Sequence, residues 1–244
     1  EGDASTIKEI KILGNKTYST RLLKSLIKSG PKYWFEVWSD KDIYNSTFLD
    51  QDIEAIRDYY LNRGYAKFKV VSKQVNLSPD KEDIYITLSI DEGTLYKFGK
   101  TTVYGLDNFD SNIFKNIINY NLDPGSFFSR SNIETAKEAI QFVLGEKGYA
   151  FPLVQLNVEL KDDSESVDIT IRVDPKKKSF VRRINIKGNT KTNDEVYRRE
   201  LRQFESSIYS INKVERSKIR LQRLKFVNKV DIKKTIVDEE NGHI

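Results

Sequence analysis

The stretch Ile10-Lys11-Ile12-Leu13-Gly14-Asn15 returns near the other end of the chain as Ile184-Asn185-Ile186-Lys187-Gly188-Asn189. A degraded copy, Thr102-Val103-Tyr104-Gly105-Leu106, lies between the two. Each copy reads as a short alternating strand that ends in a turn. The three glycines follow one another at intervals of about 80 to 90 residues, a period typical of small domains in a tandem array.

A second landmark follows a helical run. It reads Arg63-Gly64-Tyr65-Ala66 and then Lys147-Gly148-Tyr149-Ala150, with Leu224-Lys225-Phe226-Val227 in the matching third place. A glycine here is typical of a residue that closes a helix, and the tyrosine is expected to pack under the next strand rather than bind a ligand. Because the two landmarks recur at similar intervals along the chain, we predict three repeats, over residues 1–93, 94–175 and 176–244.

Hydrophobic periodicity predicts the order strand, helix, helix, strand, strand in each repeat. In the first repeat these elements are residues 7–13, 20–28, 50–62, 68–77 and 84–90, with a loop rich in aromatic residues (Tyr33, Trp34, Phe35, Trp38) between the helices. In the second repeat they are residues 100–105, 110–120, 131–146, 154–160 and 167–173. Ser131, with Glu134 three residues on, has capping-box spacing and predicts the start of the longer helix.

The third repeat follows the same order but is unfinished. Its predicted elements are a strand over 181–187, helices over 194–204 and 213–224, and a strand over 227–236. A last strand is missing, so we expect the full-length protein to continue beyond Ile244. The predicted fold class is therefore α+β: three domains in tandem, each with a three-stranded mixed sheet and two helices on one face, the third lacking its last strand.

Residue types that carry chemistry are scarce. The 244 residues include no cysteine and one histidine, His243, and no phosphate-binding glycine motif occurs. Catalytic triads, thiolate nucleophiles and histidine-rich metal sites are therefore not expected. We predict that the protein is not an enzyme and uses no metal or cofactor.

The net charge of +5 is a small excess of 41 basic over 36 acidic residues. Basic residues gather in the third repeat, at Arg198, Arg199, Arg202, Arg216, Lys218, Arg220, Arg223 and Lys225. An acidic protein partner fits this cluster, and we predict no nucleic acid, because no nucleic-acid-binding motif accompanies the charge.

The second strand of each predicted sheet (68–77, 154–160 and 227–236) is a candidate edge, where an extended peptide could add as another strand. In the first repeat the candidate residues are Lys69, Val70, Val71, Ser72 and Lys73. Lysines lie on or beside the edges, at Lys67, Lys69, Lys73, Lys229, Lys233 and Lys234. Two interpretations stay open with equal weight: docking of a peptide, or lysines that protect an exposed edge from aggregation.

Longer motifs resemble a known family. These are Tyr59-Tyr60-Leu61-Asn62-Arg63-Gly64-Tyr65-Ala66, Leu77-Ser78-Pro79-Asp80-Lys81, Gly148-Tyr149-Ala150-Phe151-Pro152-Leu153-Val154-Gln155 and Arg198-Arg199-Glu200-Leu201-Arg202-Gln203-Phe204-Glu205. They are similar to POTRA domains, in particular to the last three of the five in outer-membrane protein assembly factors of Gram-negative bacteria. The resemblance implies a soluble array on the periplasmic face of the outer membrane, continuous with a C-terminal membrane β-barrel.

The resemblance also implies partners: unfolded outer-membrane proteins and the accessory lipoproteins of the assembly machinery. A BamD-like lipoprotein is expected at Glu205, with Arg202 and Arg199 beside it. A BamB-like lipoprotein is expected on the first repeat, around its second helix and second strand. From the residues alone, Glu205 is better explained as an ordinary helix-end carboxylate paired with Arg202, because exposed ion pairs are common and weak.

Two other functions remain as alternatives. One is the POTRA arm of a two-partner secretion transporter. The other, less favoured, is a nucleic-acid-binding module that uses the arginines of the third repeat. A salt titration separates these classes, because phosphate binding weakens steeply with salt and strand addition much less.

Overall fold

The structure, a computed structural model, describes residues 5–32, 42–189, 192–238 and 241–244. The aromatic loop predicted around Tyr33, Trp34, Phe35 and Trp38 lies outside them. Contacts divide the chain into two compact units. The first comprises Glu1–Lys100, Asp123–Ile133 and Glu159–Asp168, and the second comprises Thr101–Leu122, Glu134–Val158 and Ile169–Ile244.

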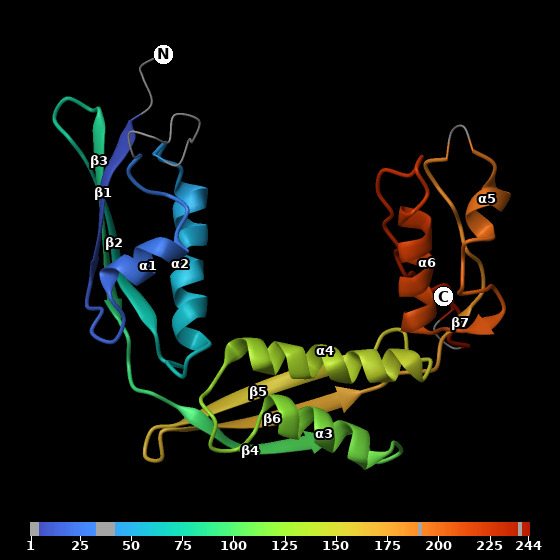
Figure 1. Ribbon diagram of the computed structural model, residues 1–244. Coiled ribbons are helices and arrows are strands. Elements are labelled where there is room, and N and C mark those ends of the chain that lie inside the picture. The colour runs from blue at the N-terminus through green and yellow to red at the C-terminus, as the bar shows by residue number, and fades with distance from the viewer. Residues whose placement is uncertain (1–4, 33–41, 190–191, 239–240) are drawn as a thin grey trace. The chain divides into compact units, whose positions relative to one another are not determined.

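The first repeat forms a three-stranded mixed sheet with both helices on one face (Figure 1). Its elements are β1 (Thr6–Leu13), α1 (Thr20–Leu26), α2 (Ser46–Leu61), β2 (Lys69–Leu77) and β3 (Asp83–Asp91). The strand order is β1-β3-β2, with β3 parallel to β1 and antiparallel to β2. The predicted order of elements is therefore confirmed in this repeat.

The core of the first repeat follows from the alternation of β3. Ile84, Ile86, Leu88 and Ile90 are buried and pack with residues of β1 and α2 in one cluster. α2 begins four residues before the predicted start, because the side chain of Asn45 accepts the N–H groups of the first turn and caps the helix there.

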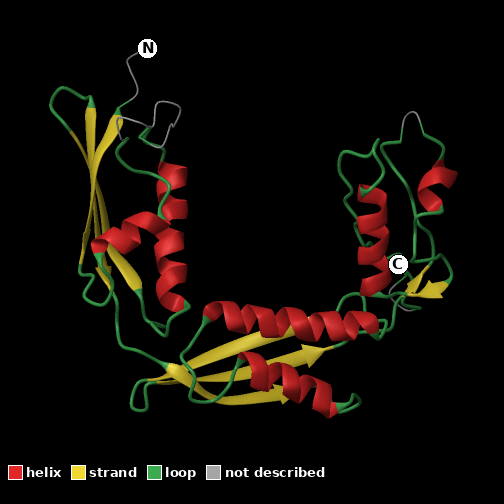
Figure 2. Ribbon diagram, in the orientation of Figure 1, coloured by secondary structure: helices red, strands yellow, loops and turns green. Residues whose placement is uncertain are grey.

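The second repeat has the same order of elements (Figure 2). These are β4 (Lys97–Tyr104), α3 (Ser111–Asn121), α4 (Arg130–Glu146), β5 (Leu153–Lys161) and β6 (Ser166–Asp174), and the sheet order is β4-β6-β5. The capping box predicted at Ser131 is wrong. Ser131 lies inside α4, and the hydroxyl of Ser129 accepts the N–H of Asn132 instead.

The third repeat departs most from prediction. Its elements are β7 (Phe180–Val181), α5 (Asp194–Arg198), β8 (Ser207–Ile208) and α6 (Ile211–Gln222). The strand predicted over 181–187 and the helix predicted over 194–204 are thus much shorter than expected. The helix stops early because the N–H groups of Arg202 and Gln203 donate to the hydroxyl of Ser217 rather than continuing the helical ladder.

The strand predicted over residues 227–236 is wrong: these residues form no strand. In the first sheet the second strand pairs with the central strand. In the third repeat the central position holds His243, which forms a parallel bridge with Phe180 and an antiparallel bridge with Asp238. A strand needs a partner for its backbone groups, and residues 227–236 have no such neighbour among the described residues.

No helix in the described ranges combines the length and the apolar composition required to cross a lipid bilayer.

Candidate protein-binding sites

The first candidate site is the outer edge of β2. β2 is an end strand, as predicted, and among the described residues no strand lies on its other side in the sheet. The register with β3 shifts between Val70 and Ser72, which leaves Val71 as an extra residue in a bulge, 62% exposed. From Ser72 to Leu77 the pairing is regular, so this part of the edge is a straight template.

In an antiparallel pair of strands every second residue forms hydrogen bonds with the partner strand, so the residues of β2 fall into two sets. The N–H of Ser78 donates to the carbonyl of Asp83, 2.8 Å away, which fixes the phase of the ladder. Alternate residues then bond to β3, and those between them direct both N–H and C=O away from it. The outward residues are Lys73, Val75 and Leu77.

The side chains of these outward residues lie on the helix-covered face, because each is opposite a buried residue of β3. Val75 and Leu77 remain 37% and 50% exposed there. Lys73 reaches α2, where its ammonium lies 2.7 Å from a carboxylate oxygen of Asp50. This hydrogen bond raises the pKa of Lys73 above its usual value.

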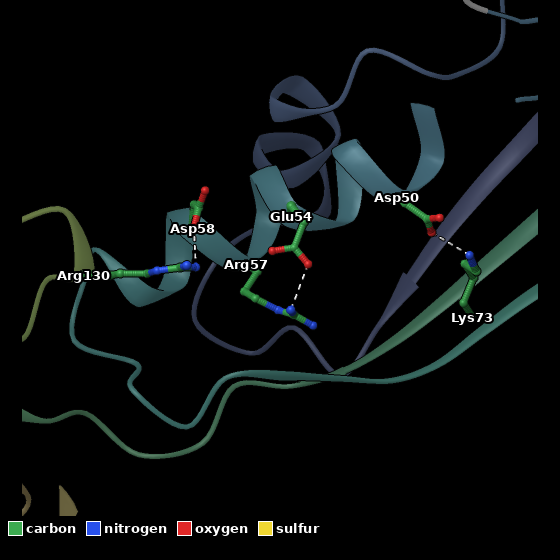
Figure 3. A network of polar contacts seen from close by, with 6 residues as sticks. All are labelled: Asp50, Glu54, Arg57, Asp58, Lys73 and Arg130. Atoms are coloured by element: carbon green, nitrogen blue, oxygen red, sulfur yellow. Dashed lines mark hydrogen bonds and ion pairs between the residues drawn. The ribbon is translucent and has the colours of Figure 1, made fainter. Parts of the chain in front are cut away.

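Asp50 belongs to a row of three carboxylates on α2 (Figure 3). The other two are Glu54, 2.8 Å from Arg57, and Asp58, 3.3 Å from Arg130 of α4. The three carboxylates line a shallow depression of about 500 Å³ together with Thr47, Gln51 and Ala55. All three ion pairs are exposed, so each contributes about 0–1 kcal/mol to stability and can be exchanged for contacts with a partner.

The second candidate site surrounds Glu205, which lies between α5 and β8. Its carboxylate accepts the N–H of Ile184 at 2.7 Å and a guanidinium N–H of Arg198 at 3.1 Å. Arg198 also donates to the carbonyl of Ile184 at 2.9 Å, so the two side chains hold both backbone groups of one residue. The hydrogen bonds from Ile184 and Arg198 lower the pKa of Glu205.

The structure does not join the other two predicted residues to Glu205. The guanidinium of Arg202 donates to the carbonyls of Arg199 and Leu201, and that of Arg199 lies 3.9 Å from Glu200. The expected pairing of Glu205 with Arg202 is therefore wrong. Arg198 takes that place at a separation of seven residues, beyond the three- and four-residue spacings at which side chains pair on a helix, and gave no signal in the sequence.

A small hollow of about 240 Å³ opens beside Glu205, lined by Ile184, Arg198, Leu201, Gln203, Phe204 and Glu205. Phe204 is 59% exposed, and the side chain of Glu205 is 40% exposed. Exposed aromatic rings such as that of Phe204 are enriched at protein interfaces.

Comparison with known proteins assigns the chain to a family. The family model described as "POTRA: Surface antigen variable number repeat" matches residues 5–93, 96–176 and 179–244. Outer membrane protein assembly factor BamA of Neisseria meningitidis serogroup B is 31% identical over 94% of this chain and 29% of its own length. BamA of Buchnera aphidicola is 32% identical over 95% of this chain and 37% of its own length. The chain thus spans about a third of the length of the curated relatives it matches.

Among solved structures, POTRA3-5 of Haemophilus influenzae BamA matches with a TM-score of 0.84 and 29% identity, over 98% of this chain and 93% of that one. The similarity covers all three repeats. The chain therefore belongs to the POTRA family.

Proposed function

We propose that this chain is a periplasmic scaffold of outer-membrane protein assembly, and that it receives unfolded outer-membrane proteins by strand addition at β2. The relatives it matches carry the name of outer-membrane protein assembly factors, which supports the process. The site is supported by a single observation: Lys73, Val75 and Leu77 direct unpaired backbone groups outward from an end strand.

The exposed valine and leucine favour this role over mere edge protection. A protected edge carries charge and avoids apolar side chains. Here the lysines form ion pairs, Lys73 with Asp50 and Lys69 with Asp91. The side chains of Val71, Val75 and Leu77 are exposed to solvent. An added strand would cover this apolar surface and supply partners for the backbone.

A proline substitution tests the site. Val75→Pro removes an outward N–H and leaves the pairing of β2 with β3 in place, because proline is tolerated on an edge strand when its N–H side faces solvent. We expect a labelled synthetic peptide that copies one strand of an outer-membrane protein to bind the wild-type chain and to lose binding to Val75→Pro. Fluorescence anisotropy measures the binding, and the affinity for the peptide should depend only weakly on salt concentration.

Val75→Thr is the matched variant, because it keeps the N–H and a β-branched side chain, and it should bind like the wild type. Amide chemical shifts on peptide addition should change at residues 72–77. Equal binding to Val75→Pro, or shifts confined to another part of the chain, would refute strand addition at β2.

We propose a second role for the surface around Glu205, which is docking of a BamD-like lipoprotein. The accessible carboxylate, the exposed ring of Phe204 and the hollow between them support this role. A BamB-like lipoprotein is proposed to dock on α2 and β2, where the row of exposed carboxylates offers replaceable ion pairs. In both roles the chain binds and orients other proteins and catalyses no reaction.

A further inference from the structure

The second helix of the first repeat is linked to the second helix of the next one. Asn62, at the end of α2, accepts the N–H of Ser131 in the first turn of α4 through its side-chain oxygen, at 2.8 Å. The carbonyl of Gly64 accepts the N–H of Tyr96 at 2.8 Å, and the carbonyl of Tyr96 accepts the N–H of Phe128 at 3.0 Å. These three hydrogen bonds all lie inside the first compact unit.

The same three links recur inside the second compact unit. Glu146, at the end of α4, accepts the N–H of Asn212 in the first turn of α6 at 2.7 Å. The carbonyl of Gly148 accepts the N–H of Ser179 at 2.8 Å, and the carbonyl of Ser179 accepts the N–H of Tyr209 at 2.9 Å. An arrangement that appears twice, with different side chains in the same places, is a feature of the repeat and not a chance contact.

This arrangement gives a second explanation for the glycine of the Gly-Tyr landmark. A Cβ at Gly64 would lie 3.1 Å from the side chain of Leu95, and a Cβ at Gly148 would lie 2.8 Å from the side chain of Ile208. Glycine therefore closes one helix and also lets the following repeat approach the closing turn.

The helix caps explain why a neighbour is needed. Asn45 caps α2 alone, because its oxygen accepts the N–H groups of both the second and the third helical residue. Ser129 and Ser210 each accept only the third, from Asn132 and Lys213. In α4 and α6 the N–H of the second helical residue is left to an acceptor from the preceding repeat.

We infer that Asn62 and Glu146 are positioning residues in a capping relay, by which each repeat completes the helix start of the next and couples the stability of the two. This relay is independent of the binding function proposed above.

Amide hydrogen exchange on the whole chain tests the relay. Glu146→Ala removes the acceptor, and we expect exchange in the first turn of α6 to accelerate roughly five- to tenfold, the factor that corresponds to loss of one helix cap. Glu146→Gln keeps a carbonyl acceptor and should exchange like the wild type. Glu134→Ala, an exposed α4 carboxylate paired with Lys137, is the control and should leave α6 unchanged.

A second-site change distinguishes the relay from general damage to the fold. Ser210→Asn supplies a cap that can accept two N–H groups, as Asn45 does, so it should restore protection, or folding if Glu146→Ala unfolds the chain. Unchanged exchange in Glu146→Ala, or failure of Ser210→Asn to restore what Glu146→Ala loses, would overturn the inference. Asn62→Ala, with Glu54→Ala as its control because Glu54 pairs within α2, repeats the comparison at the first link.

Discussion

A Cβ atom at Gly14 would lie 2.1 Å from the carbonyl oxygen of Ile90, so the turn after β1 packs directly against the backbone of β3. The second repeat has the same contact, with 1.9 Å between a Cβ at Gly105 and the carbonyl oxygen of Val173. Gly188 has the same left-handed backbone, with φ of +88°, but no described atom lies within 4 Å of its Cβ position. In the first two repeats the position therefore requires glycine both for its left-handed backbone and for the close contact with β3 or β6. In the third repeat only the left-handed backbone requires it.

Alanine substitution should separate these requirements. Gly14→Ala and Gly105→Ala are each expected to lower the free energy of unfolding by about 2–4 kcal/mol, from left-handed strain together with overpacking. Gly188→Ala carries only the strain and should cost about 1 kcal/mol. Urea titration of the three variants checks this order, and equal losses would show that the backbone contact adds nothing.

The stability of the first repeat should depend on the ionisation of Glu92. This buried carboxylate accepts N–H groups of Lys16 and Thr17 and the hydroxyl of Tyr60 at 2.7 Å. Burial raises the pKa of Glu92, but the hydrogen bonds from Tyr60, Thr17 and Lys16 outweigh it and hold the pKa below its usual 4.5. The stabilisation is present above the unfolded pKa and is lost as the pH falls through the lower folded value.

Melting temperatures between about pH 7 and pH 3 should therefore fall less steeply for Glu92→Gln than for the wild type. At neutral pH the same substitution is expected to cost about 1–3 kcal/mol, since hydrogen bonds to a charged acceptor are replaced by weaker ones. Parallel pH profiles for the two proteins would contradict the assignment.

Ser217 should be required for the loop that presents Glu205. Its buried hydroxyl accepts the N–H of Arg202 at 2.7 Å and that of Gln203 at 3.3 Å, and donates to Lys213. Ser217→Ala leaves two N–H groups without this acceptor and is expected to cost about 1–3 kcal/mol in chemical denaturation. Ser25→Ala, which removes an exposed hydroxyl of α1, should change stability by less than about 0.5 kcal/mol.

Two substitutions of Glu205 should separate its effect on stability from its effect on docking. Glu205→Lys removes the acceptor of Ile184 and sets a cation beside Arg198, so it should lower the unfolding free energy by about 1–3 kcal/mol and also abolish binding of a BamD-like lipoprotein. Glu205→Gln keeps an acceptor oxygen, so its melting temperature should stay near that of the wild type while binding weakens. Calorimetric titration measures the binding, and full affinity in Glu205→Gln would exclude a role for the charge.

Much of the fold could be predicted from sequence, because its local signals agree with its tertiary structure. The alternation Ile84, Ile86, Leu88, Ile90 predicts a buried strand, and the structure confirms it. Gly14 and Gly64 both have the left-handed backbone that the landmarks imply. These features rest on residues close together in the chain.

The errors come from partners distant in the chain. Val227–Ile236 has a strand-like pattern, yet a strand forms only beside another strand, and no local pattern reports whether one is present. Ser131 has capping-box spacing, but Asn62 and Ser129 determine where α4 begins. The contact of Glu205 with Ile184 likewise joins segments that no periodicity connects.

The capping relay has a direction along the chain. Asn62 and Glu146 precede the helices whose first turns they complete, so each acceptor exists before its donor when a polypeptide emerges with its N-terminus first. Domains that emerge in sequence tend to fold in that order. Vectorial emergence therefore gives the second and third repeats a folded neighbour to build on, whereas either of them expressed without its predecessor must begin its longest helix with one N–H group open to water.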